Sequence, residues 1–533
     1  MTTSTRLLTL LATLLLAMPA PVSAGKVIDL DSATIADLNA AFKAGTLTAE
    51  KLVQMCLARI QAYDRQGPHL RAVIRVNPKA LETARTLDTE RRNQGPRSPL
   101  HGIPIVLKDN FDTADLPTTG GSVLLEGSVP KDDAFLVRKL RDAGAIIVAK
   151  VNMSEFASGA AHGSLVGQIL NPHDPTRSPS GSSGGTGAAI AAAYAVVGLG
   201  TDTGGSIRGP STANGIVGLK PTHGLLSRDG IIPLALSFDT GGPMARSVYD
   251  VAAALGVMTG VDAADAATQK SEGRFDTDYT KYLKEGSLKD ARIGIARDFL
   301  GQDTDVDWVV EAALDTMRRE GATVEDVRFP KWLLDSKGEF YNAIRYPEFT
   351  AQIADYLATI GPSYPKNIAE LIERATRINA LRADGASPNP SRWNLMKREA
   401  GAGKLDDYRY TSVRDHALPM VRAVVDGILA SQKLDAIVYP TSSRRPGLIA
   451  APPEVPGGGP ASAANIANLT GFPDLIVPAG FTGDDLPVGL SFFGPAFSEG
   501  KLLALGYSFE QATRARRLPV HTPRLTGEAV TVP

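Results

Sequence analysis

Serine hydroxyls in two glycine-rich segments have the type and spacing for chemistry. Ser182 and Ser183 lie in 178–187, which reads SPSGSSGGTG, and Ser206 lies in 200–208, which reads GTDTGGSIR. Residues 159–242 hold 18 of the 52 glycines in this 533-residue chain, so glycine is concentrated about twofold around these serines. Because glycine permits positive φ and close approach to the main chain, such segments can direct several N–H donors at one point.

Two glycine-rich motifs fit these segments poorly. A phosphate-binding loop would end in Gly-Lys-Ser/Thr or open its helix with G-x-G-x-x-G, and neither pattern is present here. Residues 181–185 match the G-x-S-x-G nucleophile elbow, which would make Ser183 the nucleophile. That elbow follows a strand, whereas the preceding residues 171–175 read NPHDP and indicate a loop broken by proline. The motifs therefore favour neither phosphate binding nor an elbow.

A third chemistry uses two serines on separate loops with a lysine as the base in place of histidine. Neither serine segment contains any of the seven histidines, although His162 and His223 flank the pair. Ordinary tight turns are the alternative for the two segments taken alone, since Gly and Ser are common turn residues.

Apolar runs of strand length alternate with helical patterns, which is typical of layered α/β proteins. Predicted strands are 102–107, 145–149, 196–199, 292–296 and 436–439, and a helix over 134–141 ends before Gly144. We therefore predict an α/β fold with a mixed, largely parallel central sheet covered by helices on both faces.

Helical periodicity dominates two other parts of the chain. Residues 34–93 carry it, with Thr48 as one N-cap and Asn77 as another, followed by Pro78 at the first helical position. Residues 335–415 are rich in charged residues and helix formers, which predicts a helical variable region within a single domain over 25–533. No repeat and no long linker divides the chain.

Residues 1–24 have the pattern of a secretory signal peptide. Arg6 precedes an apolar run over 7–18, and a Val-Ser-Ala ending predicts cleavage after Ala24. Twelve residues rise only about 18 Å as a helix, short of the roughly 30 Å hydrocarbon core. We therefore predict a periplasmic or secreted protein without a stable membrane anchor.

Composition excludes several function classes. Lys and Arg total 56 against 57 Asp and Glu, so no broad basic field exists to bind nucleic acid. The single cysteine, Cys56, excludes an internal disulfide and a cysteine-cluster metal site, and its helical position predicts a core residue.

Lys108 at the end of the strand 102–107, Ser182 in GSSGG and Ser206 in GGSIR together resemble the amidase signature family of amide hydrolases. The resemblance runs from about Ile35 to Ala512 and includes PLHGIPIVLKDN, GLKPTHGLLSRDGIIPL and LPVGLSFFG. It implies the amidase signature fold and a Ser-cisSer-Lys triad, with no metal or organic cofactor.

The resemblance assigns Ser206 as the nucleophile, Ser182 as the proton shuttle and Lys108 as the base. A free lysine titrates near about 10.4, so this base must be desolvated to be neutral. The apolar strand before Lys108 is consistent with such burial.

The resemblance also implies a set of supporting groups. The backbone N–H groups of Thr203, Gly204, Gly205 and Ser206 resemble the oxyanion hole of the family. Residues expected to support the loops or line the substrate are Ser183, Asp202, Arg208, Met153 and Ser154. We expect Asp202 and Arg208 to form a buried ion pair that braces the nucleophile loop.

The expected reaction is hydrolysis of the C–N bond of a linear carboxamide through a serine acyl-enzyme, as in secreted bacterial amidases of the peptide-amidase kind. The partner would be a small-molecule or peptide amide, and no nucleic acid. The glutaminase subunit of a tRNA-dependent amidotransferase shares these motifs and is the first alternative. A catalytically inactive secreted binding protein is the second.

Overall fold

An 11-stranded sheet organises the part of the chain that the computed structural model describes, residues 26–378, 386–449 and 461–532. Its strands, in spatial order, are β11 (Thr323–Val327), β10 (Arg292–Ala296), β12 (Ala436–Pro440), β14 (Pro487–Phe493), β13 (Asp474–Phe481), β8 (Val217–Lys220), β9 (Thr240–Ala245), β7 (Val197–Asp202), β3 (Pro104–Lys108), β4 (Ile146–Val151) and β2 (Val73–Val76). Two small sheets pair β1 (Lys26–Asp29) with β15 (Ala529–Val532) and β5 (His162–Gly163) with β6 (Gly167–Gln168).

The predicted α/β class with a mixed sheet is confirmed, but the sheet is less parallel than predicted. Parallel pairing is confined to two flanks, β11-β10-β12 and β7-β3-β4. Every pair from β12 through β14, β13, β8 and β9 to β7 is antiparallel, and so is β4 with β2. The short connection between β13 and β14 forces that pair to run antiparallel, because a parallel pair needs a long crossover.

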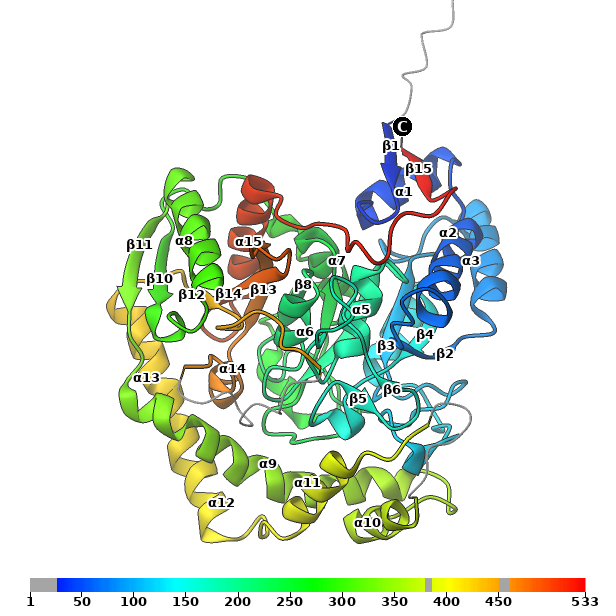
Figure 1. Cartoon of the computed structure of the whole chain (residues 1–533). Helices are drawn as coiled ribbons and strands as arrows, with labels where there is room; N and C mark the ends of the chain where they lie inside the picture. Colours follow the sequence, from blue (N-terminus) through cyan, green and yellow to red (C-terminus); the bar gives the residue numbers. More distant parts are fainter. Residues whose placement is uncertain (1–25, 379–385, 450–460, 533) are drawn as a thin grey trace, which may run out of the picture.

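Helices cover both faces of the sheet, as predicted (Figure 1). They are α1 (Ile35–Ala44), α2 (Ala49–Arg59), α3 (Ala80–Gln94), α4 (Phe135–Asp142), α5 (Gly184–Ala191), α6 (Arg208–Ala213), α7 (Val248–Met258), α8 (Thr304–Arg319), α9 (Lys331–Thr359), α10 (Ile368–Arg377), α11 (Pro390–Ala400), α12 (Tyr408–Ser412), α13 (Leu418–Ser431), α14 (Ile466–Thr470) and α15 (Glu499–Thr513).

Thr48 caps α2 as predicted, since its side chain accepts from the N–H of Lys51. The predicted cap at Asn77 is wrong, because α3 begins at Ala80. Asn77 instead accepts from the N–H of Lys79 and donates to the carbonyl of Ile147, which fixes a turn after β2.

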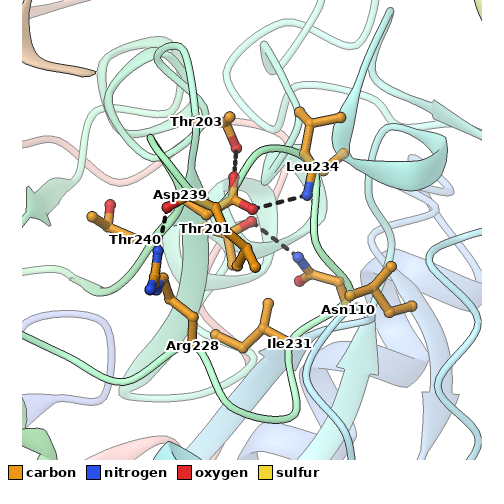
Figure 2. A pocket seen from close by; sticks show the side chains of 12 residues that line it. Asn110, Thr201, Thr203, Arg228, Ile231, Leu234, Asp239 and Thr240 are labelled. Atoms are coloured by element: carbon orange, nitrogen blue, oxygen red, sulfur yellow. Dashed lines mark hydrogen bonds between the residues drawn. The ribbon is translucent and has the colours of Figure 1, made fainter. Parts of the chain in front are cut away.

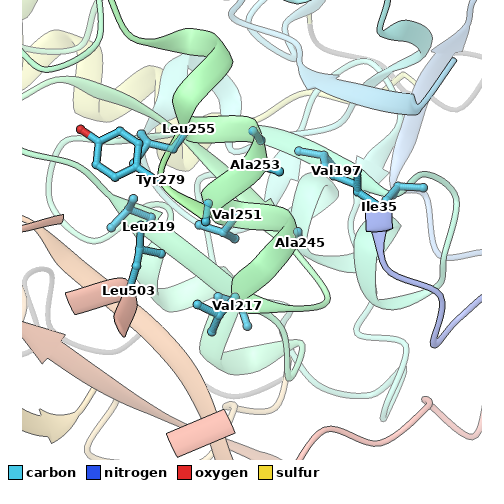
Figure 3. Packing of buried hydrophobic residues seen from close by; sticks show 14 of the residues in the cluster. Ile35, Val197, Val217, Leu219, Ala245, Val251, Ala253, Leu255, Tyr279 and Leu503 are labelled. Carbon is cyan, nitrogen blue, oxygen red and sulfur yellow. The ribbon is translucent and has the colours of Figure 1, made fainter. Parts of the chain in front are cut away.

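Alternate side chains of β3 enter different hydrophobic clusters. Ile105 and Leu107 of β3 pack with α4 and α7, whereas Val106 between them packs with α5 on the other face. Figure 3 shows the first cluster, in which Val217 and Leu219 of β8 lie near Val251 of α7. Side chains on both faces of β3 are therefore buried, and their packing fixes the position of the strand end. Cys56 is buried in α2, as predicted.

Within 331–378 and 386–417 the structure has helices α9 to α12 and no strand, in agreement with the helical pattern predicted over 335–415 for these residues. In Figure 1, helices α9 to α12 lie along one end of the molecule, below the sheet. No helix within 26–378, 386–449 or 461–532 is both long and apolar enough to cross a membrane. The predicted signal peptide over 1–24 lies outside the described residues.

Candidate active site

Lys108 is the last residue of β3, a strand whose five residues are all buried. The Nζ atom of Lys108 lies 2.7 Å from Ser182 Oγ and 2.7 Å from Thr201 Oγ1 on the neighbouring strand β7. Because β3 and β7 run parallel, their C-terminal ends meet at the same edge of the sheet. The structure therefore brings two of the three predicted catalytic side chains into contact.

Burial lowers the pKa of Lys108 to about 7, although the carboxylates of Asp202 and Asp239 act in the opposite direction. The side chain is 0% exposed, so its ammonium form loses its hydration. A lysine with this pKa is substantially neutral near pH 7 and can accept a proton from Ser182.

The Ser182 loop is held by close backbone contacts. Its Gly181–Ser182 peptide bond is cis, and the carbonyl of Ser182 accepts from the N–H of Ser154 at 3.0 Å. A Cβ on Gly185 would lie 2.1 Å from the carbonyl oxygen of Asn152, so only glycine fits there. Ser183 links the loop to β7, because its Oγ donates to the Thr201 carbonyl at 3.2 Å and accepts from the Thr201 N–H at 3.3 Å.

Ser206 lies in the turn between β7 and α6, directly beside the Ser182 loop. Its carbonyl accepts from the N–H of Ser183 at 3.2 Å, which joins the two glycine-rich segments. Its side chain is partly exposed, and its hydroxyl makes no hydrogen bond to any described residue. A free hydroxyl at the site edge is available to a ligand.

The four predicted oxyanion donors do not have equal freedom. The N–H of Gly205 is already bound, since it donates to Asp202 Oδ1 at 2.8 Å. The N–H groups of Thr203, Gly204 and Ser206 have no hydrogen-bond partner in the described part of the chain. Three donors of the turn therefore remain for an oxyanion.

Asp202 and Arg208 form the predicted buried ion pair, with Arg208 Nε 3.1 Å from Asp202 Oδ2. Arg208 also lies 3.3 Å from Asp474 of β13, and Asn468 of α14 donates to Asp202 at 2.9 Å. Burial raises the pKa of Asp202, but the charge and hydrogen bonds of Arg208 outweigh burial and hold it well below its usual range. Asp202 thus stays ionised and fixes the turn that carries Ser206.

We expect Arg208→Ala to lower the free energy of unfolding by about 3–5 kcal/mol, because it leaves the carboxylates of Asp202 and Asp474 buried without their cation. Urea unfolding followed by fluorescence measures this loss. Arg297→Ala is the matched control, since Arg297 is paired with Glu311 and Asp326 at a more exposed position. Its loss should stay near 1 kcal/mol or less. Equal losses in the two variants would contradict the bracing role of Arg208.

Comparison with known proteins identifies the family. A family model described as Amidase matches residues 51–503. This chain belongs to the amidase family. It is 40% identical to the solved structure of native peptide amidase from Stenotrophomonas maltophilia, with a TM-score of 0.80 over 92% of this chain and 98% of that chain. It is 37% identical over 497 residues to a glutamyl-tRNA(Gln) amidotransferase subunit from Myxococcus xanthus, covering 91% of this chain and 98% of the relative.

The helical segment of this amidase is fastened over the site. On α9, Glu348 accepts from the N–H and the hydroxyl of Ser237 at 2.9 and 2.5 Å. Glu399 of α11 lies between Arg345 at 2.5 Å and Arg392 at 2.8 Å, and all three side chains are buried. A Cβ on Gly204 would lie 2.8 Å from the Tyr341 hydroxyl of α9. The segment therefore reaches the Ser206 turn.

Met153 and Ser154, predicted to line the substrate, are both fully buried in the amidase. Met153 belongs to the hydrophobic cluster shared with α9 and α10. Ser154 contacts Gly181, where an added Cβ would lie 2.4 Å from Ser154 Oγ. They support the Ser182 loop and the helical segment, and substrate contact by either one stays a prediction.

Several residues of the site were missed from the sequence. Asn110 donates to Thr201 Oγ1 at 3.1 Å, and Asp239 accepts from Thr203 Oγ1 at 2.5 Å. Asn110 and Thr201 lie inside the resembling motifs, but nothing in those motifs marks them as polar partners of Lys108. Asp239 comes from a segment 33 residues after Ser206, and no local pattern marked it.

Proposed function

We propose that this amidase hydrolyses the C–N bond of a linear carboxamide through an acyl-enzyme on Ser206, releasing ammonia or an amine. The observation that carries the proposal is the 2.7 Å contact between Lys108 Nζ and Ser182 Oγ, both of which belong to buried side chains. An amide is a poor electrophile, so its hydrolysis requires an activated nucleophile and a stabilised oxyanion.

In the proposed first half-reaction, Ser206 Oγ bonds to the carbonyl carbon as its proton passes to Ser182. Ser182 passes its own proton to neutral Lys108, which becomes an ammonium. The oxyanion lies near the N–H groups of Thr203, Gly204 and Ser206. When the C–N bond breaks, the proton returns from Lys108 through Ser182 to the leaving nitrogen.

Water completes the reaction. A water molecule adds to the acyl carbon while one of its protons passes through Ser182 to Lys108. The acyl C–O bond to Ser206 then breaks, and the proton returns from Lys108 through Ser182 to Ser206 Oγ. The carboxylic acid leaves, and the protein regains its starting protonation state.

The helical segment near 335–415 is our candidate for the part that shapes the substrate pocket. Tyr341 of α9 lies against Gly204, whose own N–H is one of those proposed to bind the oxyanion. The structural similarity to a protein named peptide amidase favours C-terminal peptide amides as the first substrates to test. The predicted signal peptide supports a periplasmic or secreted site of action.

A second candidate function is glutamine hydrolysis within a tRNA-dependent amidotransferase. The identity to proteins named as glutamyl-tRNA(Gln) amidotransferase subunits favours it, since 37% of 497 aligned residues are shared with one of them. The predicted signal peptide argues against it, because such a protein works beside tRNA in the cytoplasm. The two functions predict different preferred substrates.

The test combines a substrate panel with a serine-directed probe. We expect ammonia release from amidated peptides or aliphatic amides to exceed that from glutamine, measured with a coupled ammonia assay. A fluorophosphonate should label one serine per chain, and peptide mass mapping should place the label on Ser206. Glutamine as the preferred substrate would support the amidotransferase function. Absence of both label and turnover would support an inactive binding protein.

A further inference from the structure

A small cavity lies between the end of β7 and the segment 228–241 (Figure 2). Its volume is about 10 Å³, close to the minimum that can hold one water molecule. The residues that line it include apolar ones such as Ile231 and six polar or charged ones: Asn110, Thr201, Thr203, Arg228, Asp239 and Thr240. It is too small for a substrate, but the polar residues among its lining could offer hydrogen-bond partners to one water molecule.

Asn110 supplies an unpaired acceptor at this cavity. Its side chain is 1% exposed, and its Nδ2 donates to Thr201 Oγ1. Its Oδ1 has no hydrogen-bond partner among the residues that the structure describes. A buried amide oxygen without a partner is costly, so a donor in the cavity would be favoured.

Thr201 supplies a donor. Its Oγ1 lies 2.7 Å from Lys108 Nζ and 3.1 Å from Asn110 Nδ2, and both of those groups can donate to it. A hydroxyl that accepts twice still has its own proton to donate. Thr201 lines the cavity, so this proton can be donated into it.

Asp239 supplies a second acceptor. Oδ1 of its carboxylate accepts from Thr203 Oγ1 at 2.5 Å, and Oδ2 accepts from the N–H groups of Leu234 and Ala235 at 2.8 and 3.0 Å. A carboxylate has about four lone-pair sites, so one remains on Oδ1. Figure 2 shows this carboxylate beside Thr201, across the cavity from Asn110.

We propose that one water molecule occupies this cavity, accepting from Thr201 and donating to Asn110 and Asp239. Through this water and Thr201, Asp239 is a positioning residue that sets the pH range in which Lys108 acts as a base. The inference rests on the proposed function of Lys108. Three hydrogen bonds are the usual number for a buried water. The same carboxylate holds Thr203, whose N–H belongs to the proposed oxyanion hole.

Few charged groups surround Lys108 and Asp239. Asp202 and Asp239 both raise the pKa of Lys108 against the dominant effect of burial. Burial raises the pKa of Asp239 to about 6, while hydrogen bonds and Arg228 lower it. Arg228 is itself paired with Asp265, and Tyr341 of α9 faces the two aspartates. Asp239 is therefore an ionised neighbour of Lys108 at neutral pH.

Asp239→Asn removes this charge and keeps the size of the side chain and one of its two acceptor oxygens. The amide nitrogen cannot accept the hydrogen bonds of the oxygen that it replaces. We expect the acid midpoint of the kcat/KM profile against pH to move down by about half a unit to one unit, because the pKa of Lys108 falls when a neighbouring anion is lost. Asp250→Asn is the matched control. Asp250 is also buried, burial raises its pKa to about 6 and it accepts a backbone N–H, but it lies on α7. Its midpoint should equal that of the wild type.

An unchanged or raised midpoint in Asp239→Asn overturns the inference while the proposed function stands. A wild-type kcat/KM profile that does not fall at acid pH would instead count against Lys108 as the base. A crystal structure of the wild type at high resolution provides an independent test if Asp239→Asn fails to fold. Density for a water within hydrogen-bond distance of Asn110 Oδ1 and Asp239 Oδ1 supports the inference, and a dry cavity overturns it.

Discussion

Ser206→Ala is expected to lower kcat/KM for the best amide substrate by about 10⁴-fold or more, to the residual activity that binding and oxyanion stabilisation alone provide. The variant has no oxygen to form the acyl-enzyme. Its fold should persist, because no described residue hydrogen-bonds to the Ser206 hydroxyl and its carbonyl still accepts from Ser183. Steady-state ammonia release and intact-protein mass after fluorophosphonate treatment measure the two losses.

Ser183→Ala is the control for this experiment, since it removes a hydroxyl from the neighbouring position that matches the nucleophile elbow. Among the described residues, the Ser183 hydroxyl bonds only to the main chain of Thr201, at 3.2 and 3.3 Å. We expect some loss of stability, on the order of 1–2 kcal/mol, with activity within about tenfold of the wild type. Full activity in Ser206→Ala, or a loss confined to Ser183→Ala, would disprove the assignment of the nucleophile.

The strands around Lys108 could be predicted from the sequence, whereas the centre of the sheet could not. Arg292–Ala296 and Pro104–Lys108 are apolar runs with the usual strand signal. Thr240–Ala245 reads TGGPMA and lacks it. A Cβ on Gly242 would lie 2.2 Å from the carbonyl oxygen of Leu219, so the close approach of the two strands requires glycine there. Glycine in turn weakens the sequence signal of a strand, which is why β9 was not predicted. Because β9 pairs antiparallel with both of its neighbours, the prediction without it overestimated the parallel share of the sheet.

The contacts of the site could be predicted where both partners lie in the same loop. Asp202 and Arg208 are six residues apart, and their pairing followed from position beside Ser206. Thr201 and Asp239 become neighbours of Lys108 only through the order of strands β3, β7 and β9. No spacing along the chain encodes that order, so their roles required the fold.

Activity is expected to rise with pH through a midpoint near 7, because burial lowers the pKa of Lys108 to about 7 and only its neutral form accepts a proton. The neutral fraction falls about tenfold for each pH unit below the pKa, so kcat/KM should fall by the same factor between pH 6 and pH 5. Above the midpoint the profile should be flat until another group titrates. Initial rates of ammonia release across pH 5–9 measure it.

Lys108→Met should lower kcat/KM at pH 8 by about 10³-fold, within the range for loss of a general base, and should remove the acid limb. Lys220→Met is the matched control, since Lys220 also ends a buried strand and burial lowers its pKa to about 8. Its Nζ donates to the carbonyls of Pro221 and Phe472, so its loss should affect stability and leave the midpoint near 7. If the acid limb vanished in Lys220→Met and persisted in Lys108→Met, the assignment of Lys108 as the base would be wrong. Because Lys108 bonds to Ser182, whereas the hydrogen bonds of Lys220 to described residues go only to carbonyl groups, we expect the opposite outcome.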